Sequence, residues 1–215
     1  MLKFTELHPI GMPIGCIVTL HGRGVRGEDL APLAEAIALE GIRWIFPDGP
    51  MELPAPWGGR AWYEIPPHPP QGLLQSRKLL FELIERLEQE RIPSKRIALA
   101  GFSQGAVMSL DVGVRYPRRL AGIVAMSGYL ARPERLAAEK SPAAAGLPIL
   151  LTHGKNDDVL PVEGAREAQA ALRTEGFSVR LREYLMGHEV IPEVLSEIRD
   201  FLNRIFESEP RDRRS

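Results

Sequence analysis

The sequence predicts an α/β fold in which a mainly parallel central sheet is covered by helices on both faces. Two observations lead to it. Short apolar runs alternate along the chain with longer segments whose apolar residues recur at helical spacing, and this alternation implies strand–helix–strand units with parallel strands. The runs at 97–100 and 123–126 are almost continuously apolar, as expected of strands that are buried on both faces.

The predicted elements follow each other in a regular order. Strands are predicted at residues 15–20, 42–46, 96–100, 122–126, 149–152 and 179–184. Helices are predicted at residues 29–39, 73–89, 104–115, 164–175 and 191–206. The segment at 73–89 shows the helical period most clearly, because its leucines and isoleucine recur on one face and charged residues occupy the other. No repeat period is visible, which argues against a repeat protein.

The length and the net charge of the chain indicate how many domains it has and which partners it is expected to lack. A chain of 215 residues, 44% of them hydrophobic, can bury a core of its own. We therefore expect one domain over residues 1–206 and a polar tail at 207–215. The formal net charge is -1, from 27 basic and 28 acidic residues, so no nucleic-acid partner and no attraction to an anionic membrane surface are expected.

The compartment is predicted from the cysteine count and the N-terminal segment. Cys16 is the only cysteine, so no disulfide can form within the chain and a reducing compartment is expected. Residues 1–13 contain Glu6, His8 and two prolines instead of a basic cap and a long apolar run, which argues against a signal peptide. Apolar runs such as 14–20 are far shorter than the roughly 18 residues of a membrane span. The sequence predicts a soluble, cytoplasmic protein without stable membrane insertion, and it leaves a homodimer open.

The segment at 47–71 interrupts the pattern. It holds eight prolines together with Trp57, Trp62 and Tyr63. Proline removes backbone donors and restricts the residue before it, so no regular element is expected here. A long loop in a compact domain is either functional or disordered, and the aromatic residues favour an ordered loop that lines a substrate pocket. Core packing of the same aromatic residues beneath the loop is the alternative.

Residues 101–105 have the pattern Gly-x-Ser-x-Gly, with Ser103 at its centre. They directly follow the predicted strand at 96–100 and open the predicted helix at 104–115. In so tight a turn the serine backbone is strained, and glycines on either side let the strand and the helix approach each other. The hydroxyl then lies at a helix N-terminus, where developing negative charge is favoured. This context predicts that Ser103 is a nucleophile and not the solvent-facing serine of a small-residue turn.

A serine nucleophile needs a general base, usually a histidine that a carboxylate orients. In chains with this elbow, the acid follows the serine and the histidine follows the acid. His188 is the only one of five histidines that comes late enough. The acid is expected after the strand at 149–152, where spacing alone does not choose between Asp157 and Asp158, and where either carboxylate can instead cap a turn. A metal site built from His153 and these aspartates lacks zinc-type ligand spacing, so no metal and no cofactor are expected.

Acyl transfer also needs donors for the oxyanion, each worth about 3 kcal/mol when removed by mutation. The backbone N–H of Gln104, the residue after the nucleophile, is one expected donor. The other is expected in the loop at 20–24, where Arg23 is flanked by Gly22 and Gly24. A plain turn is the alternative, and the Gly-Lys-Ser/Thr ending of a phosphate-binding loop is absent.

With these motifs in this order, the sequence resembles the carboxylesterase/phospholipase family of α/β-hydrolases, which includes acyl-protein thioesterases and small bacterial esterases. The matching segments are residues 20–24, 101–106, 153–161 and 187–188. The resemblance extends from about residue 16 to 205 and implies the α/β-hydrolase fold. It further implies that Asp157 is the catalytic acid and that Arg23 and Gln104 supply the oxyanion donors.

The resemblance also bears on the pocket. Residues 58–63 are similar to a stretch that lines the acyl pocket in the bacterial branch, which supports the assignment of Trp62 and Tyr63 to that pocket. Tyr129, close after the strand at 122–126, is expected at its border. Two departures stand out: many thioesterase members have leucine at the position of Arg23, and the loop at 47–71 is shorter than the lids of lipases, so interfacial activation is not expected.

The expected function is hydrolysis of a small-molecule carboxylic ester through an acyl-enzyme on Ser103, with an apolar acyl or alcohol group favoured. A thioesterase or lysophospholipase with the same chemistry is the alternative. A non-catalytic binding protein with the hydrolase fold is a third reading, disfavoured because every element of the machinery is present.

Overall fold

The computed structural model of the chain describes residues 1–56, 58–65 and 70–207. Within these residues, a central sheet of seven strands has the order β1-β3-β2-β6-β7-β8-β9. Every neighbouring pair is parallel except β1 with β3. The strands are β1 (Phe4–Leu7), β2 (Gly15–Leu20), β3 (Ile42–Pro47), β6 (Ile97–Phe102), β7 (Gly122–Met126), β8 (Pro148–Gly154) and β9 (Ser178–Tyr184). The six predicted strands are all present, which confirms the mainly parallel sheet.

The edge strand β1 was not predicted from the sequence. It spans four residues that are only partly buried, and it pairs with β3 so that Phe4 lies opposite Pro47 and Leu7 opposite Trp44. Glu6 interrupts its apolar character. A short half-covered edge strand lacks the continuous apolar run by which the inner strands are recognised.

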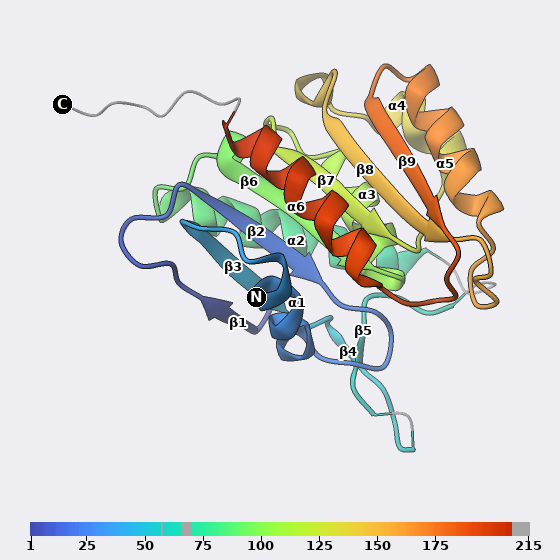
Figure 1. Cartoon of the computed structure of the whole chain (residues 1–215), viewed down its shortest axis with the longest axis horizontal. Coiled ribbons are helices and arrows are strands. Elements are labelled where there is room, and N and C mark those ends of the chain that lie inside the picture. The colour runs from blue at the N-terminus through green and yellow to red at the C-terminus, as the bar shows by residue number, and fades with distance from the viewer. Residues whose placement is uncertain (57, 66–69, 208–215) are drawn as a thin grey trace.

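Helices cover both faces of the sheet (Figure 1). They are α1 (Ala31–Ile37), α2 (Gln71–Gln89), α3 (Gln104–Gly113), α4 (Leu136–Glu139), α5 (Glu163–Thr174) and α6 (Pro192–Glu207). The apolar residues of α1 and α6 join one core cluster on one face of the sheet. Those of α2, α3 and α5 join a second cluster on the opposite face. The predicted two-sided arrangement is therefore confirmed.

Several helix boundaries differ from the prediction for local reasons. The helix predicted at 29–39 consists of a 3-10 turn (Gly27–Leu30) followed by α1, and α1 ends because Ala38 takes a left-handed φ of 51°. The short helix α4 and the turns around it were not predicted, because four residues are too few to show a helical period. Glu207 still belongs to α6, and residues 208–215 of the expected tail lie outside the described residues.

The described part of the proline-rich segment contains regular structure, although the sequence predicted no regular element there. It contains a small antiparallel pair of strands, β4 (Met51–Glu52) and β5 (Arg60–Ala61). Arg60 continues the pairing on its other side through a bridge to Val25. The prolines keep these strands to two residues each, and the bridge joins the segment to the loop after β2.

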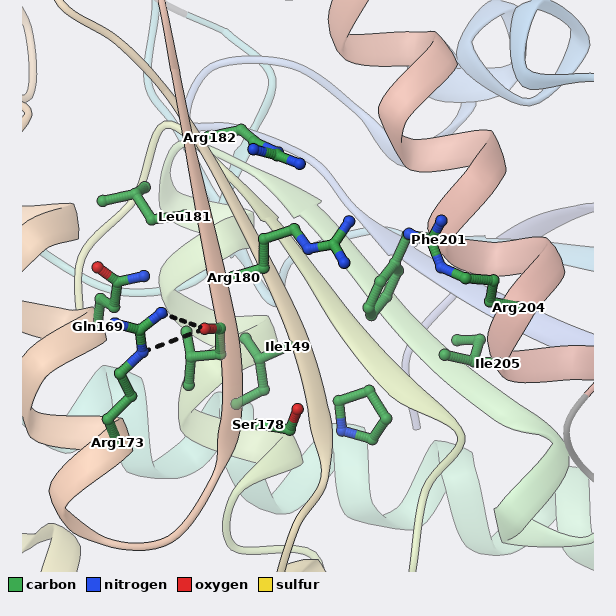
Figure 2. A pocket seen from close by; sticks show the side chains of 12 residues that line it. Ile149, Gln169, Arg173, Ser178, Arg180, Leu181, Arg182, Phe201, Arg204 and Ile205 are labelled. Carbon is green, nitrogen blue, oxygen red and sulfur yellow. Dashed lines mark hydrogen bonds between the residues drawn. The ribbon is translucent and has the colours of Figure 1, made fainter.

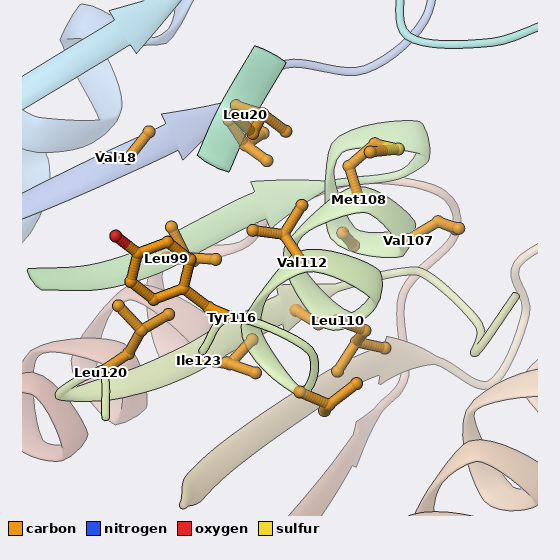
Figure 3. Packing of buried hydrophobic residues seen from close by; sticks show 14 of the residues in the cluster. Val18, Leu20, Leu99, Val107, Met108, Leu110, Val112, Tyr116, Leu120 and Ile123 are labelled. Atoms are coloured by element: carbon orange, nitrogen blue, oxygen red, sulfur yellow. The ribbon is translucent and has the colours of Figure 1, made fainter. Parts of the chain in front are cut away.

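Helix α3 is the most enclosed helix of the described chain segments, with every residue buried. Figure 3 shows its side chains packed between strands of the sheet and neighbouring elements. The contacts on this face include Val107, Leu110 and Val112 from α3 with Leu99 and Ile123 from the sheet. Each fully buried side chain of this size contributes about 1.5–3 kcal/mol. This packing consequently fixes the position of the N-terminus of α3.

Parallel strands end at the same edge of the sheet, so the loops that follow them lie together. The predicted site residues are on these loops. Residues 21–24 follow β2, Ser103 follows β6, Tyr129 is close after β7, Asp157 follows β8 and His188 follows β9.

Candidate active site

Ser103 lies in the tight strand-to-helix turn that its motif predicts. It is the residue between β6 and α3, with φ of 54° and ψ of -120°, a backbone region that costs a non-glycine residue energy. A Cβ on Gly101 would come 2.2 Å from the Gly105 oxygen, and a Cβ on Gly105 would come 2.0 Å from the Leu20 oxygen. Both positions therefore require glycine.

Backbone hydrogen bonds hold Ser103 in this conformation. Its N–H donates to the Met126 carbonyl at 2.9 Å, and its own carbonyl accepts the N–H groups of Ala106 and Val107. The residue is thus tied to β7 and to the first turn of α3. Its side chain lies at the helix N-terminus, which favours negative charge nearby.

Asp157 and His188 come together although they are far apart in the sequence. The Nδ1–H of His188 donates to Oδ2 of Asp157 at 2.7 Å. The other carboxylate oxygen, Oδ1, accepts the backbone N–H groups of Val159 and Leu160 at 3.0 and 2.8 Å. Asp158 is exposed, so the structure distinguishes the two adjacent aspartates that spacing could not.

The electrostatics of this pair favour an ionised carboxylate. Burial by itself would raise the pKa of Asp157, but the hydrogen bonds from His188 and from the backbone of Leu160 and Val159 outweigh it and lower the pKa below its ordinary value. A charged Asp157 holds the proton of His188 on Nδ1 and leaves Nε2 free to accept a proton.

His188 lies beside the serine turn. Its ring centroid is 4.8 Å from that of Phe102, the residue before Ser103, and its side chain is 15% exposed. The loop that carries it is packed against the end of β8, since a Cβ on Gly154 would come 2.3 Å from the Met186 oxygen. The serine, the histidine and the aspartate therefore occupy one region of the sheet edge.

His153 is hydrogen-bonded within the turn that carries Asp157. Its Nε2 lies 2.7 Å from the Leu160 carbonyl and 3.4 Å from Oδ2 of Asp157, so its proton is on Nε2 and the ring braces the turn that carries Asp157. Across the described ranges, no three histidine, cysteine, aspartate or glutamate side chains are grouped to hold a metal ion.

The two predicted oxyanion donors are both backbone N–H groups. In the part of the chain that the structure describes, neither the N–H of Arg23 nor that of Gln104 donates to another group. An ideal Cβ on Gly22 would lie 3.5 Å from Cβ of Ser103, so the peptide that carries the Arg23 N–H is beside the serine. The guanidinium of Arg23 extends toward the Tyr63 carbonyl, 3.3 Å away.

The side chain of Gln104 has a role that the motif did not suggest. Its Oε1 accepts the N–H of Trp62 at 2.8 Å, and its Nε2 donates to the Tyr63 carbonyl at 2.8 Å. The Trp62 carbonyl in turn accepts the hydroxyl of Ser76 on α2. Gln104 thereby joins the serine turn to residues 62–63 of the proline-rich segment. No pattern among neighbouring residues predicts this contact, because the residues that it joins are about forty positions apart in the sequence.

The predicted pocket residues differ in their surroundings. Trp62 has no exposed surface, and its indole N–H donates to the His21 carbonyl at 2.9 Å, so it supports the loop from within. The hydroxyls of Tyr63 and Tyr129 are 3.5 Å apart, and burial raises the pKa of Tyr63, which keeps its hydroxyl neutral. Trp57 lies outside the described residues.

Arg60 of β5 lies near a carboxylate on the paired strand β4. Its guanidinium lies 4.0 Å from the exposed Glu52 carboxylate. Such an exposed contact contributes little.

A groove of about 620 Å³ lies away from these residues, along β9 and the C-terminal half of α6 (Figure 2). Arg180, Arg182 and Arg204 line it, and Arg173 donates to the Val179 carbonyl at the outer edge of β9 (Figure 2). None of the predicted site residues lines this groove. Among the described helices, none is long and apolar enough to cross a membrane.

Known proteins are similar to this chain over most of its length. The sequence pattern of the phospholipase/carboxylesterase family matches residues 9–206. Acyl-protein thioesterase 1 of Schizosaccharomyces pombe is 35% identical over 170 residues, which cover 74% of this chain and 76% of that protein. Acyl-protein thioesterase 1 of Eremothecium gossypii is 30% identical over 208 residues, which cover 89% of this chain and 88% of that protein.

Solved structures are similar over almost the whole chain. The esterase PE8 superimposes with a TM-score of 0.87 and 30% identity, over 95% of this chain and 99% of its own. Acyl-protein thioesterase 2 of Zea mays superimposes with a TM-score of 0.81 and 27% identity, also over 95% of this chain and 99% of its own. The chain therefore belongs to the phospholipase/carboxylesterase family and is a hydrolase with the α/β-hydrolase fold.

Proposed function

We propose that the protein is a serine carboxylesterase in which Ser103 is the nucleophile, His188 the general base and Asp157 the residue that orients the base. The observation that carries the proposal is the 2.7 Å hydrogen bond between His188 Nδ1 and Asp157 Oδ2 beside a serine in a strained turn. A largely buried carboxylate that is hydrogen-bonded to a histidine, with the two residues on different loops, supports a catalytic assignment more than a structural one.

In the acylation step, Nε2 of His188 takes the hydroxyl proton of Ser103 as its oxygen attacks the ester carbonyl. The N–H groups of Arg23 and Gln104 donate to the resulting oxyanion. When the tetrahedral intermediate collapses, the bond from the carbonyl carbon to the alcohol oxygen breaks, and His188 gives the proton to the leaving alcohol. The acyl group remains on Ser103.

In the deacylation step, a water molecule takes the place of the alcohol. His188 accepts one of its protons, the hydroxide adds to the acyl carbon and the same two N–H groups hold the second oxyanion. Release of the carboxylic acid returns the proton to Ser103. The cycle needs no metal or cofactor.

The surroundings of the proposed site support an ester with an apolar group. The hydroxyls of Tyr63 and Tyr129 face each other. Val159 and Leu185, close in sequence to Asp157 and His188, are 60% and 83% exposed. Apolar side chains that remain exposed beside a site favour contact with apolar parts of a ligand.

Labelling with a fluorophosphonate probe tests the assignment, because the probe reacts only with an activated serine. The wild type is expected to label and to hydrolyse short p-nitrophenyl esters, and Ser103→Ala is expected to do neither. Ser196→Ala is the matched control, since Ser196 is exposed on α6 and its hydroxyl donates to the Pro192 carbonyl of the same helix. An unlabelled wild type would refute the proposal and would leave a non-catalytic binding protein. Equal labelling of Ser103→Ala would refute the assignment of Ser103 as the nucleophile.

A thioesterase or lysophospholipase is the second candidate, favoured by relatives named acyl-protein thioesterase. The chemistry is the same and only the leaving group and the acyl length differ. Values of kcat/KM for short p-nitrophenyl esters, acyl-CoA, an S-acylated peptide and a lysophospholipid distinguish these substrates. We expect the short ester to be the best of the four.

A further inference from the structure

His21 is a buried histidine that the proposed mechanism does not use. It is the first residue after β2 and has no exposed surface. Its Nδ1 lies 2.6 Å from the Gly22 carbonyl oxygen, and the Gly49 N–H donates to its Nε2 at 2.8 Å. A carbonyl cannot donate a hydrogen bond, so the proton is on Nδ1, and Nε2 presents its lone pair to Gly49. Both ring nitrogens therefore have determined roles.

The carbonyl that His21 binds belongs to the same peptide unit as the Arg23 N–H. This unit is planar and trans, because the cis bond among the described residues is Ala55–Pro56. In a trans peptide the C=O and the N–H point in opposite directions. A hydrogen bond that holds the Gly22 carbonyl toward His21 therefore directs the Arg23 N–H away from His21.

The peptide would not hold this orientation without help. It joins Gly22 to Arg23 and rotates with ψ of Gly22 and φ of Arg23, and glycine's wide range of backbone angles makes that rotation easy on the Gly22 side. Its place is next to the nucleophile, since an ideal Cβ on Gly22 would be 3.5 Å from Cβ of Ser103. A rotated peptide would present a carbonyl oxygen where the oxyanion forms, and would repel it.

We propose that His21 is a positioning residue that aims the Arg23 N–H at the oxyanion formed on the Ser103-bound substrate. The inference rests on the proposed function, because it concerns the transition state of that reaction. His21 acts through the Gly22–Arg23 peptide and does not itself touch the substrate.

The ring is well anchored for this role. Its centroid lies 5.1 Å from that of Trp62, whose indole N–H donates to the His21 carbonyl. Burial lowers the pKa of His21 and outweighs the opposing effect of its hydrogen bond to the Gly22 carbonyl. The ring is therefore neutral at neutral pH, in agreement with one donor and one acceptor nitrogen.

Two substitutions separate the two ring nitrogens. In His21→Asn, the side-chain N–H can occupy the place of Nδ1 and still donate to the Gly22 carbonyl. In His21→Gln, the side-chain oxygen can reach the place of Nε2 and accept the Gly49 N–H, but nothing holds the Gly22 carbonyl. The matched control is His8→Gln, because the His8 side chain is 61% exposed and pairs with Glu6, away from the loop at 20–24.

In His21→Gln we expect kcat to fall about 10²-fold, as it does when one oxyanion donor is removed. The KM should stay within about threefold of the wild type. His21→Asn is expected to lose less than about tenfold. A trifluoromethyl ketone forms a tetrahedral adduct on Ser103. In His21→Gln its inhibition constant should rise by about the factor by which kcat/KM falls. His8→Gln should match the wild type in all three measurements.

The outcomes separate this inference from the proposed function. If the wild type neither labels nor hydrolyses esters, the proposed function fails and the role of His21 fails with it. If the wild type is active and His21→Gln is equally active, or if Asn and Gln lose kcat equally, only the positioning role is overturned.

A measurement on the wild type covers the case in which His21→Gln does not fold. The ¹⁵N chemical shifts of the His21 ring report which nitrogen carries the proton. We expect a protonated Nδ1 and an unprotonated Nε2, and the opposite tautomer would overturn the inference.

Discussion

The substitution Asp157→Asn gives a sharp test of the proposed catalytic arrangement, because the structure determines how the new side chain must lie. Oδ1 of Asp157 accepts two backbone N–H groups, from Val159 and Leu160. An asparagine must place its oxygen there, since its NH₂ group would otherwise face two donors and leave them unsatisfied, at about 1–3 kcal/mol each. The NH₂ group is then directed at His188.

That orientation reverses the proton on the histidine. Because Nδ1 of His188 then faces an N–H donor, it becomes an acceptor and the ring proton moves to Nε2. A protonated Nε2 has no lone pair with which to accept the hydroxyl proton of Ser103. A change of this kind in a Ser-His-Asp triad lowers kcat by about 10⁴-fold, which corresponds to about 5 kcal/mol of transition-state stabilisation. The fold should be little affected, since both backbone hydrogen bonds to Oδ1 persist.

The assay is kcat on a short p-nitrophenyl ester, with Tm measured on the same preparations. Asp158→Asn is the control, because Asp158 is its exposed neighbour, and it should retain kcat within about twofold, as surface substitutions usually change little. A kcat for Asp157→Asn within tenfold of the wild type would refute this reasoning. An equal loss in Asp158→Asn would do so as well.

Two further predictions concern stability and reactivity. Gly105→Ala would place a Cβ 2.0 Å from the Leu20 oxygen. It should lower the free energy of unfolding by more than the roughly 1–3 kcal/mol of ordinary overpacking. The control Gly146→Ala, where φ is 66° and a Cβ would have nothing within 4 Å, should lower it by only about 1–2 kcal/mol. Equal losses in chemical denaturation would contradict the steric account. Burial raises the pKa of Cys16 to about 12, so a thiol reagent at neutral pH should modify it only after the protein unfolds; complete modification of the native protein would show that the thiol is accessible.

Much of the fold could be predicted because its signals are local. An apolar run identifies an inner strand, a helical period identifies a helix such as α2, and the glycines on either side of Ser103 identify the strand-to-helix turn. Each of these signals comes from a few neighbouring residues. The edge strand β1, the two-residue strands β4 and β5 and the short helix α4 escaped prediction, because so few residues carry too little of a period.

The aspartate shows where local signals stop. Asp157 and Asp158 are adjacent and chemically identical, and only a family resemblance favoured the first. In the structure, the turn after β8 directs Asp157 inward to His188 and leaves Asp158 exposed. Which of two neighbouring side chains faces inward depends on the path of the backbone, which the rest of the fold determines.

The sequence by itself determined the class of fold, the position of Ser103 in a strained turn and the order in which the acid and the histidine follow it. Only the tertiary structure decided how the supporting side chains act. His21 binds Gly49 and Gln104 binds Trp62 across 28 and 42 residues of chain. Hydrogen bonds over such separations depend on how β2, β6 and the proline-rich segment pack against each other, and no pattern among neighbouring residues records that packing.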